Sequence, residues 1–246
     1  DAGTDATFQA MHRPRSPITL QAICEVVPQI KAANDTPRVG FSFVITWPDA
    51  MGAEDGPDNV DEIPIAARLA RAHGFDYVSF KPVLVRTETG AEVMDPAHGR
   101  SRHEETLRRI RTRLDEARRL AGDGFAVLES TNLRLLEAGT WKDWTRQPRT
   151  CHFQAFRQVL SPLGLWNCPA HRGVDKARIA DPGIFAGPAG AASSALARML
   201  AAFDAAHECR DVTCLYHQAN WWIEEAIEGR RDVLAPPVED GEDYFL

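Results

Sequence analysis

The sequence predicts an α/β domain over residues 1–139, followed by a small α+β unit built from a hairpin and helices over residues 140–230. Two observations predict this fold class. In the first part, amphipathic helix patterns alternate with short apolar runs, as is typical of a parallel α/β sheet or barrel. In the second part the regular patterns become short, and four of the five cysteines of the chain lie there. Residues 231–246 form an acidic tail.

Composition limits the classes of function. A chain of 246 residues with 44% apolar residues can bury a core. Its formal net charge of -7 argues against nucleic acid or an anionic membrane as the main partner. No apolar run of about 18 residues and no charged-then-apolar leader is present, so neither a membrane span nor a signal peptide is predicted. We therefore expect a cytoplasmic protein.

The first helix is predicted over residues 17–30. Ser16 is a suitable N-cap, and Pro17 suits the first helical position. Pro28 should kink this helix or end its regular part early. Cys24 lies on the apolar face, where we expect a core residue rather than a ligand. The apolar residues at helical spacing are Leu20, Ile23, Cys24, Val27 and Ile30.

Two strands and a helix follow. Residues 38–46 are a short apolar run bounded by turn signals, which predicts a strand buried on both faces. A helix should begin at Asn59, because Asn59 and Glu62 have the spacing of a capping box. Gly74 should end that helix, and residues 75–82 predict the next strand.

A third helix is predicted over residues 103–120, with acidic and basic residues paired at i,i+4 on a solvated outer face. Residues 125–128 predict a weaker strand. The crossovers between the predicted strands are long enough for parallel pairing, which supports the α/β class.

The second part begins with a predicted hairpin flanked by two cysteines. Ser-Pro-Leu-Gly at 161–164 supplies a turn between two strands, so the hairpin should bring Cys151 and Cys168 towards each other. The strand-forming residues are Phe153, Val159, Leu160, Leu165 and Trp166.

Cys209 and Cys214 form a second pair between two helical patterns, and the two pairs together predict a cage of four sulfurs. Disulfides would need an oxidising compartment. A structural zinc site usually shows a tight Cys-x2-Cys knuckle, which is missing here. An iron–sulfur cluster accepts wider and more irregular spacings, because four irons at the corners of a cube hold the thiolates further apart. Spacing alone leaves these alternatives open.

Several segments resemble radical S-adenosylmethionine enzymes. The segments 1–5, 41–46, 59–62 and 75–82 resemble the last strands and helices of that superfamily's barrel. The cysteine unit, with Gly164 between Cys151 and Cys168 and with Cys209 and Cys214 later, resembles its C-terminal auxiliary-cluster extension of the SPASM or shorter twitch type. The resemblance covers nearly the whole chain. It implies the C-terminal half of a partial (β/α)6 TIM-like barrel followed by an auxiliary-cluster domain.

Two departures from the family pattern matter. A full SPASM extension carries more cysteines, for two clusters, so one auxiliary cluster is expected here. The Cys-x3-Cys-x2-Cys motif that holds the radical-generating cluster is absent, and residues 1–150 contain only Cys24. The resemblance therefore implies the C-terminal part of an enzyme whose first barrel half is missing, unable to cleave S-adenosylmethionine alone.

The resemblance also implies cofactors and partners. Cys151, Cys168, Cys209 and Cys214 would hold one auxiliary [4Fe–4S] cluster. In the intact enzyme a second [4Fe–4S] cluster would split S-adenosylmethionine, and the resulting radical would take a hydrogen from a peptide or small-molecule substrate. A reductant such as a flavodoxin or ferredoxin would supply electrons. No nucleic acid or membrane is expected as a partner.

Four residues of the first part are expected at the cofactor and substrate site by the same resemblance. Asp1 lies at a strand end, Asn59 follows the 41–46 strand, and Ser79 and Lys81 lie near the end of the next strand. In a parallel barrel the strand C-termini carry the site, which agrees with these positions. Three of them have a simpler alternative: Asp1 as a turn residue, Asn59 as a helix cap, and Lys81 in an ion pair.

Two other classes of function remain. One is a non-catalytic zinc-binding interaction module attached to part of an α/β domain. The other is a simple electron-transfer iron–sulfur protein. At the cysteine site itself, any one of the nearby histidines, His152, His171 or His217, could replace a thiolate as a ligand.

Overall fold

The computed structural model describes residues 1–48, 56–87, 91–94 and 103–230, and the chain divides into two compact units. The first unit comprises Asp1–Val83 and the described residues of 95–138. The second comprises Leu84–Met94 and the described residues from Gly139 onward, and it contains the four clustered cysteines. The acidic tail expected at 231–246 lies outside the described residues.

The first unit is built on a three-stranded parallel sheet in the order β1-β2-β5. Its strands are β1 (Gly40–Ile45), β2 (Tyr77–Pro82) and β5 (Ala126–Glu129). They coincide closely with the predicted runs, so the α/β class is confirmed. Parallel neighbours in strictly sequential order require a crossover after each strand.

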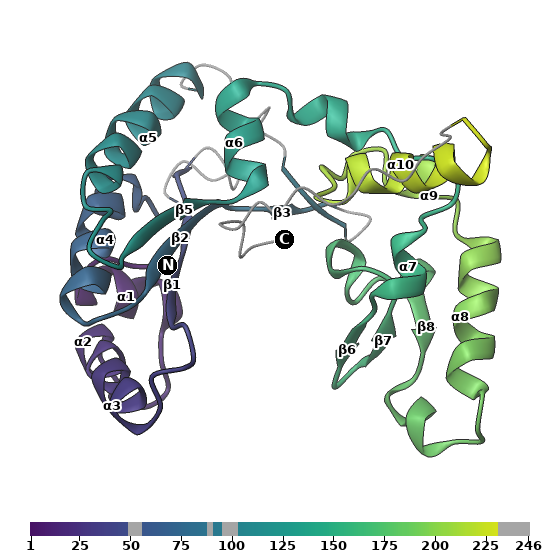
Figure 1. The fold of residues 1–246 in the computed structure, drawn as a ribbon, viewed down its shortest axis with the longest axis horizontal. Helices are drawn as coiled ribbons and strands as arrows, with labels where there is room; N and C mark the ends of the chain where they lie inside the picture. The colour runs from purple at the N-terminus through teal and green to yellow at the C-terminus, as the bar shows by residue number, and fades with distance from the viewer. Residues whose placement is uncertain (49–55, 88–90, 95–102, 231–246) are drawn as a thin grey trace. The chain divides into compact units, whose positions relative to one another are not determined.

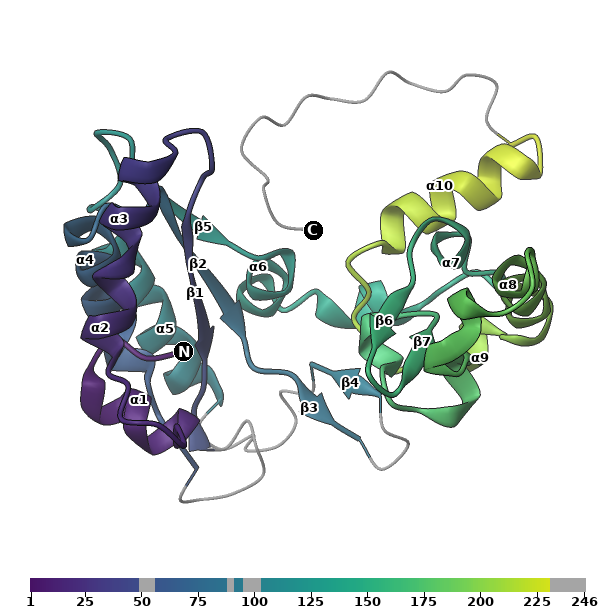
Figure 2. The same cartoon turned by 90° about the horizontal axis from the view of Figure 1, so that it is seen from below.

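Helices supply these crossovers. The α4 helix (Ile63–Ala72) follows the η2 turn (Val60–Glu62) and leads to β2, and α5 (His103–Arg118) leads to β5. Figures 1 and 2 show α4 and α5 on one face of the sheet and α6 (Thr131–Ala138) on the other.

The register of β1 and β2 determines which of their side chains lie on each face of the sheet. Phe43 and Phe80 are register partners, are fully buried, and place their rings 5.5 Å apart in an edge arrangement. Because side chains alternate along a strand, the partners Ser42 and Ser79 point to the opposite face, with Lys81 two residues further on. The sheet therefore has one apolar face and one more polar face.

The predicted helix over residues 17–30 is divided in the structure. The helices α2 (Leu20–Cys24) and α3 (Val26–Ala33) meet at Glu25, after α1 (Asp5–His12). Pro28 has no N–H to donate to the carbonyl of Cys24, which explains the break at this point. The N-cap is Thr19 rather than the predicted Ser16: the Thr19 hydroxyl accepts from the Ala22 N–H at 3.1 Å.

The apolar face predicted for this helix is buried only in part. Leu20, Cys24 and Val27 are buried, as expected for core residues, but Ile23 and Ile30 are about two-fifths exposed.

The second unit consists of short elements. The predicted hairpin is present as an antiparallel pair with Ser161 opposite Gly164. It is shorter than predicted, because Phe153 lies in the helical turn α7 rather than in a strand, and a third strand pairs with its second strand. The elements are β3 (Val85–Arg86), β4 (Glu92–Val93), η3 (Trp141–Thr145), α7 (Phe153–Phe156), β6 (Val159–Ser161), β7 (Gly164–Trp166), η4 (Pro169–His171), η5 (Asp175–Ala177), β8 (Arg178–Ala180), η6 (Pro182–Ala186), α8 (Ala191–Ala202), α9 (Ala205–Glu208) and α10 (His217–Ile227).

No helix within the described ranges has the length and apolar composition needed to cross a membrane.

Candidate metal centre

Three of the four clustered cysteines lie where a helical turn begins. Cys151 precedes α7, Cys168 is the N-cap of η4, and Cys214 lies just before α10. The first N–H groups of a helix have no partner within the helix and favour a negative charge. Nearby backbone N–H groups act against burial and lower the thiol pKa: those of Gln154 and Phe153 for Cys151, of Ala170 and His171 for Cys168, and of Tyr216 for Cys214.

Cys209 has the opposite environment. It follows the last residue of α9, and its own N–H donates back to the Ala205 carbonyl at 3.1 Å. Its neighbour is a side chain: Nε2 of His171 lies 3.4 Å from the Cys209 sulfur. The polar neighbour of the Cys209 sulfur is thus a side-chain imidazole rather than a backbone N–H group.

The four thiols are close enough to affect one another's ionisation. Burial is the main cause that raises the pKa of each thiol, and it raises that of Cys214 to about 12. The charges of the other thiols raise it further: Cys168, Cys151 and Cys214 all act on Cys209. Four thiolates in this place therefore require a cation, which is what a bound metal centre provides.

The same four sulfurs do not converge on one point. In the described part of the chain, no group of three or more His, Cys, Asp or Glu side chains could hold a metal ion as the side chains lie. A single zinc ion would need all four sulfurs about 2.3 Å from one centre. The four thiols are thus neighbours that, as their side chains lie among the described residues, do not form a metal-ligand group.

The floor of the site is apolar and contains a buried imidazole. Cys151 and Cys209 both pack against a small cluster of Ala177, Phe203 and Ala205. His171 is fully buried, with its ring edge-on to that of Phe203 at 5.5 Å. Burial lowers the pKa of His171 to about 4, so the ring is neutral near pH 7.

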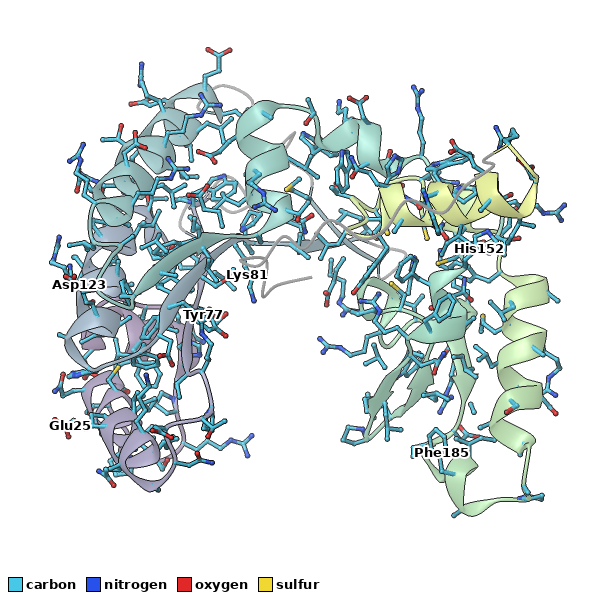
Figure 3. All side chains as sticks on the ribbon, in the orientation of Figure 1. Glu25, Tyr77, Lys81, Asp123, His152 and Phe185 are labelled. Atoms are coloured by element: carbon cyan, nitrogen blue, oxygen red, sulfur yellow. The ribbon has the colours of Figure 1, made fainter. Side chains whose placement is uncertain are left out.

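The other two candidate histidines have partners of their own. His152 approaches Glu224 on α10, with Nε2 and Oε2 2.5 Å apart, and Figure 3 shows it beside that helix. Nδ1 of His217 lies 3.2 Å from the Gln147 amide. Among the described contacts of these histidines, the only one to a cysteine sulfur is made by His171.

In the first unit, Asn59 holds the edge of β1. Its side-chain oxygen accepts from the Thr46 N–H at 2.8 Å, and its nitrogen donates to the carbonyls of Val44 at 2.9 Å and Asp1 at 3.0 Å. A carboxylate oxygen of Asp1 accepts from the Val44 N–H at 3.0 Å. Asn59 does occupy the N-cap position of η2, as predicted, but these contacts occupy its amide, so the predicted side-chain capping bond is absent.

The partner residue of the predicted capping box is also engaged elsewhere. The Glu62 carboxylate accepts from the backbone N–H of Gly3 at 2.7 Å and from the hydroxyls of Thr4 at 2.8 Å and Thr7 at 2.5 Å. Glu62 thus ties the first residues of the chain to the start of α4.

Ser79 and Lys81 share the more polar face of β2. The Ser79 hydroxyl is fully buried and has no hydrogen-bond partner among the described residues. Lys81 is partly buried, and burial lowers its pKa. Ser79 lies in the middle of β2 and Lys81 next to its last residue, with Tyr77 on the same face (Figure 3). A role for Asp1, Asn59, Ser79 or Lys81 in cofactor binding stays a prediction.

Comparison of the chain with models of protein families, with curated proteins and with solved structures finds no match.

Two residues of the site escape prediction from the sequence. Arg157 donates to the Cys168 sulfur at 3.8 Å, and Tyr216 accepts from Arg157 at 2.8 Å. Their positions offered one signal, since Arg157 lies inside the hairpin segment between two cysteines and Tyr216 lies two residues after Cys214. A lone arginine and a lone tyrosine are common enough on surfaces that this signal is weak.

Proposed function

We propose that Cys151, Cys168, Cys209 and Cys214 hold one [4Fe–4S] cluster. The observation that supports this proposal is the meeting of two distant cysteine pairs at one partly buried place in the second unit. Thiolates are the ligands that such clusters require.

The spacing of the four cysteines along the chain favours a cluster over a zinc ion. A cubane spreads its four thiolates over the corners of a cube, whereas zinc gathers them round one atom. The wide and irregular spacing, with no Cys-x2-Cys pair, suits the wider arrangement.

The chain's own residues would prepare the site for such a group, which supplies one-electron redox chemistry when bound. The backbone N–H groups at three helical turns would orient the sulfurs of Cys151, Cys168 and Cys214 and stabilise them as thiolates. The apolar floor at Phe203 would exclude water from one side.

We further propose that the first unit is part of a radical S-adenosylmethionine enzyme barrel. Three parallel strands in sequential order, with a helical crossover after each of the first two, suit consecutive repeats of a partial (β/α)6 barrel. The whole enzyme would act on a peptide or small-molecule substrate through a 5′-deoxyadenosyl radical, with a flavodoxin or ferredoxin as reductant.

Metal analysis of five single variants tests the cluster. Replacing Cys151, Cys168, Cys209 or Cys214 by Ala should lower iron and sulfide per chain and bleach the visible absorption. Cys24→Ala is the matched control, because Cys24 is buried in the first unit, and it should leave iron unchanged.

Two results would contradict the proposal. Zinc in place of iron, in protein produced with ample iron, would favour the zinc-binding module, and zinc would give no visible colour because the ion is d¹⁰. Loss of iron in the Cys24 variant would overturn the ligand assignment.

A further inference from the structure

Arg157 lies in the segment between α7 and β6 and points at the thiol cluster. Its Nη2 donates to the Cys168 sulfur at 3.8 Å, and its Nη1 donates to the Tyr216 hydroxyl at 2.8 Å. The guanidinium carbon lies 4.1 Å from the centre of the Tyr216 ring. The other contact of that ring is with Phe153, stacked at 4.4 Å. Arg157 is thus fixed by a hydrogen bond and by a stacked aromatic pair.

The positive charge of Arg157 is directed at the sulfurs rather than at an acid. Within the described residues no carboxylate forms an ion pair with Arg157, and the group that accepts its second hydrogen bond is a neutral phenol. Its charge lowers the pKa of Cys151, Cys168 and Cys214, against the larger opposing effect of burial. One guanidinium therefore acts on three of the four sulfurs.

A second cation near the site is neutralised. Lys176 acts on Cys209, but its ammonium group is paired directly with the Glu208 carboxylate. The contrast matters because an ion pair presents little net charge to a third group, whereas an unpaired guanidinium presents all of its charge.

A buried iron–sulfur cluster with four thiolates carries net negative charge, and each added electron increases it. Nearby positive charge and N–H···S hydrogen bonds favour the reduced state and so raise the reduction potential. Arg157 supplies both effects at Cys168.

We infer that Arg157 sets the reduction potential of the cluster, and that Tyr216 positions its guanidinium for this purpose. The inference rests on the proposed [4Fe–4S] site. Arg157 is a positioning and tuning residue rather than a ligand, since guanidinium nitrogens stay protonated and have no lone pair to offer a metal.

Redox titration of the full chain, reconstituted with iron and sulfide, tests the inference. Arg157→Gln keeps a donor amide but removes the charge, and it should move the midpoint potential to a more negative value with iron per chain unchanged. Arg157→Lys keeps the charge but loses the planar fork and the stacking, so its shift should be smaller and in the same direction.

Arg178→Gln is the matched control in the same unit. Arg178 also stacks on an aromatic ring, 5.6 Å from the centre of Trp166, but it is paired with Asp181 at 2.6 Å. Its removal should leave the midpoint potential of the cluster unchanged. An equal shift in this variant would mean that the potential follows the total charge of the unit, which would overturn the role given to Arg157.

Tyr216→Phe tests the position of the Arg157 guanidinium without changing its charge. It retains the ring and the charge of Arg157 but removes the hydroxyl that accepts from Nη1, so a small negative shift is expected. A parental potential in Arg157→Gln overturns the inference while leaving the cluster proposal intact. If that variant fails to load iron, parental potentials in both Arg157→Lys and Tyr216→Phe overturn it instead. Absence of iron in the parent protein would overturn the cluster proposal and this inference together.

Discussion

The two units differ in what fills their centres. Of the largest side chains that are less than 2% exposed, the ten in the first unit are all apolar, and Phe43, Phe80 and Ile110 are among them. The two in the second unit are His171 and Gln154, and both are polar. The largest fully buried side chains are thus apolar in the first unit and polar in the second.

The apolar contacts of the second unit are correspondingly small. They form separate three-residue clusters, and two of these pack against the partly buried Cys209. Since burial of apolar area is the main stabilising contribution to folding, such clusters supply little free energy. The comparison teaches that the second unit has less buried apolar area to stabilise it, so the proposed metal centre would add stability there, as it does in small metal-binding domains.

Removal of the proposed metal centre should have the largest effect of these tests. It should lower hydrogen-exchange protection in the second unit and leave the first unit unchanged. Hydrogen exchange measured by mass spectrometry on the full chain, before and after chelation, should show loss of protection over residues 153–166 and 205–227. The first unit should keep its protection over β1 and β2. Equal protection of the second unit before and after chelation would show that its small apolar clusters stabilise it without metal. The contrast drawn between the two units would then be wrong.

The reverse test removes apolar core from the first unit. Phe80→Ala deletes a fully buried ring that contacts Phe43 and should cost about 3–5 kcal/mol of unfolding free energy, measured by urea denaturation. Iron per chain should be unchanged. Phe185→Ala is the control, because Phe185 is 63% exposed in the second unit (Figure 3), and it should cost less than about 0.5 kcal/mol.

A backbone change should weaken the second unit by a smaller amount. Gly164 has φ +144°, and a Cβ there would lie 2.7 Å from the Ala180 carbonyl oxygen. Gly164→Ala should therefore strain the hairpin that leads to Cys168, at a cost of about 1–3 kcal/mol, and should speed iron loss to a chelator.

The control for this change is Gly183→Ala in the same unit. No atom lies within 4 Å of the added carbon at Gly183. This variant should lose iron at the parental rate. Parental iron loss in Gly164→Ala would show that the β6–β7 hairpin does not govern metal retention.

The sheet could be predicted from the sequence because its pattern is local. The runs at 38–46 and 75–82 contain β1 and β2, and their apolar character reports burial, which the fold then satisfies. The weaker run at 125–128 overlaps β5 for the same reason.

The predicted capping bonds failed where distant residues compete for the same groups. Asn59 and Glu62 have the spacing of a capping box, but the N-terminal segment and β1 offer them partners from outside the helix. Nothing in the local pattern reveals that Gly3 and Thr4 will be adjacent to Glu62 in the fold. The missing cap is thus a tertiary effect that overrides a local preference.

The cysteines could be singled out by residue type, whereas their surroundings could not. Arg157 and His171 reach sulfurs 11 and 38 residues away in the chain, at Cys168 and Cys209. Such contacts depend on how the hairpin and α9 pack, which no spacing rule encodes. The sequence therefore predicts a candidate ligand set, and the structure adds the groups that would tune it.

The smallest expected effect concerns acid stability of the first unit. Hydrogen bonds from Arg109 and then Arg113 lower the pKa of Asp61 to about 2. A carboxyl group with a lowered folded-state pKa stabilises the fold above its unfolded value, near about 4, and loses that contribution as the pH falls towards 2. Because the Asp61 side chain is 54% exposed, solvent screening limits the contribution to below about 1 kcal/mol.

Asp61→Asn should therefore lower the urea midpoint of the first unit slightly near pH 6 and leave it unchanged near about pH 2, where the parent carboxylate is also becoming protonated. Metal-free protein is the right sample, since acid would remove any bound metal from the second unit. Asp123→Asn is the control: Asp123 pairs with Arg71 at 2.9 Å but is 90% exposed (Figure 3), so it should change neither midpoint. A difference between parent and Asp61→Asn that persists unchanged at the lower pH would mean that Asp61 acts through packing rather than charge. The acid sensitivity of the first unit would then have to come from other carboxylates.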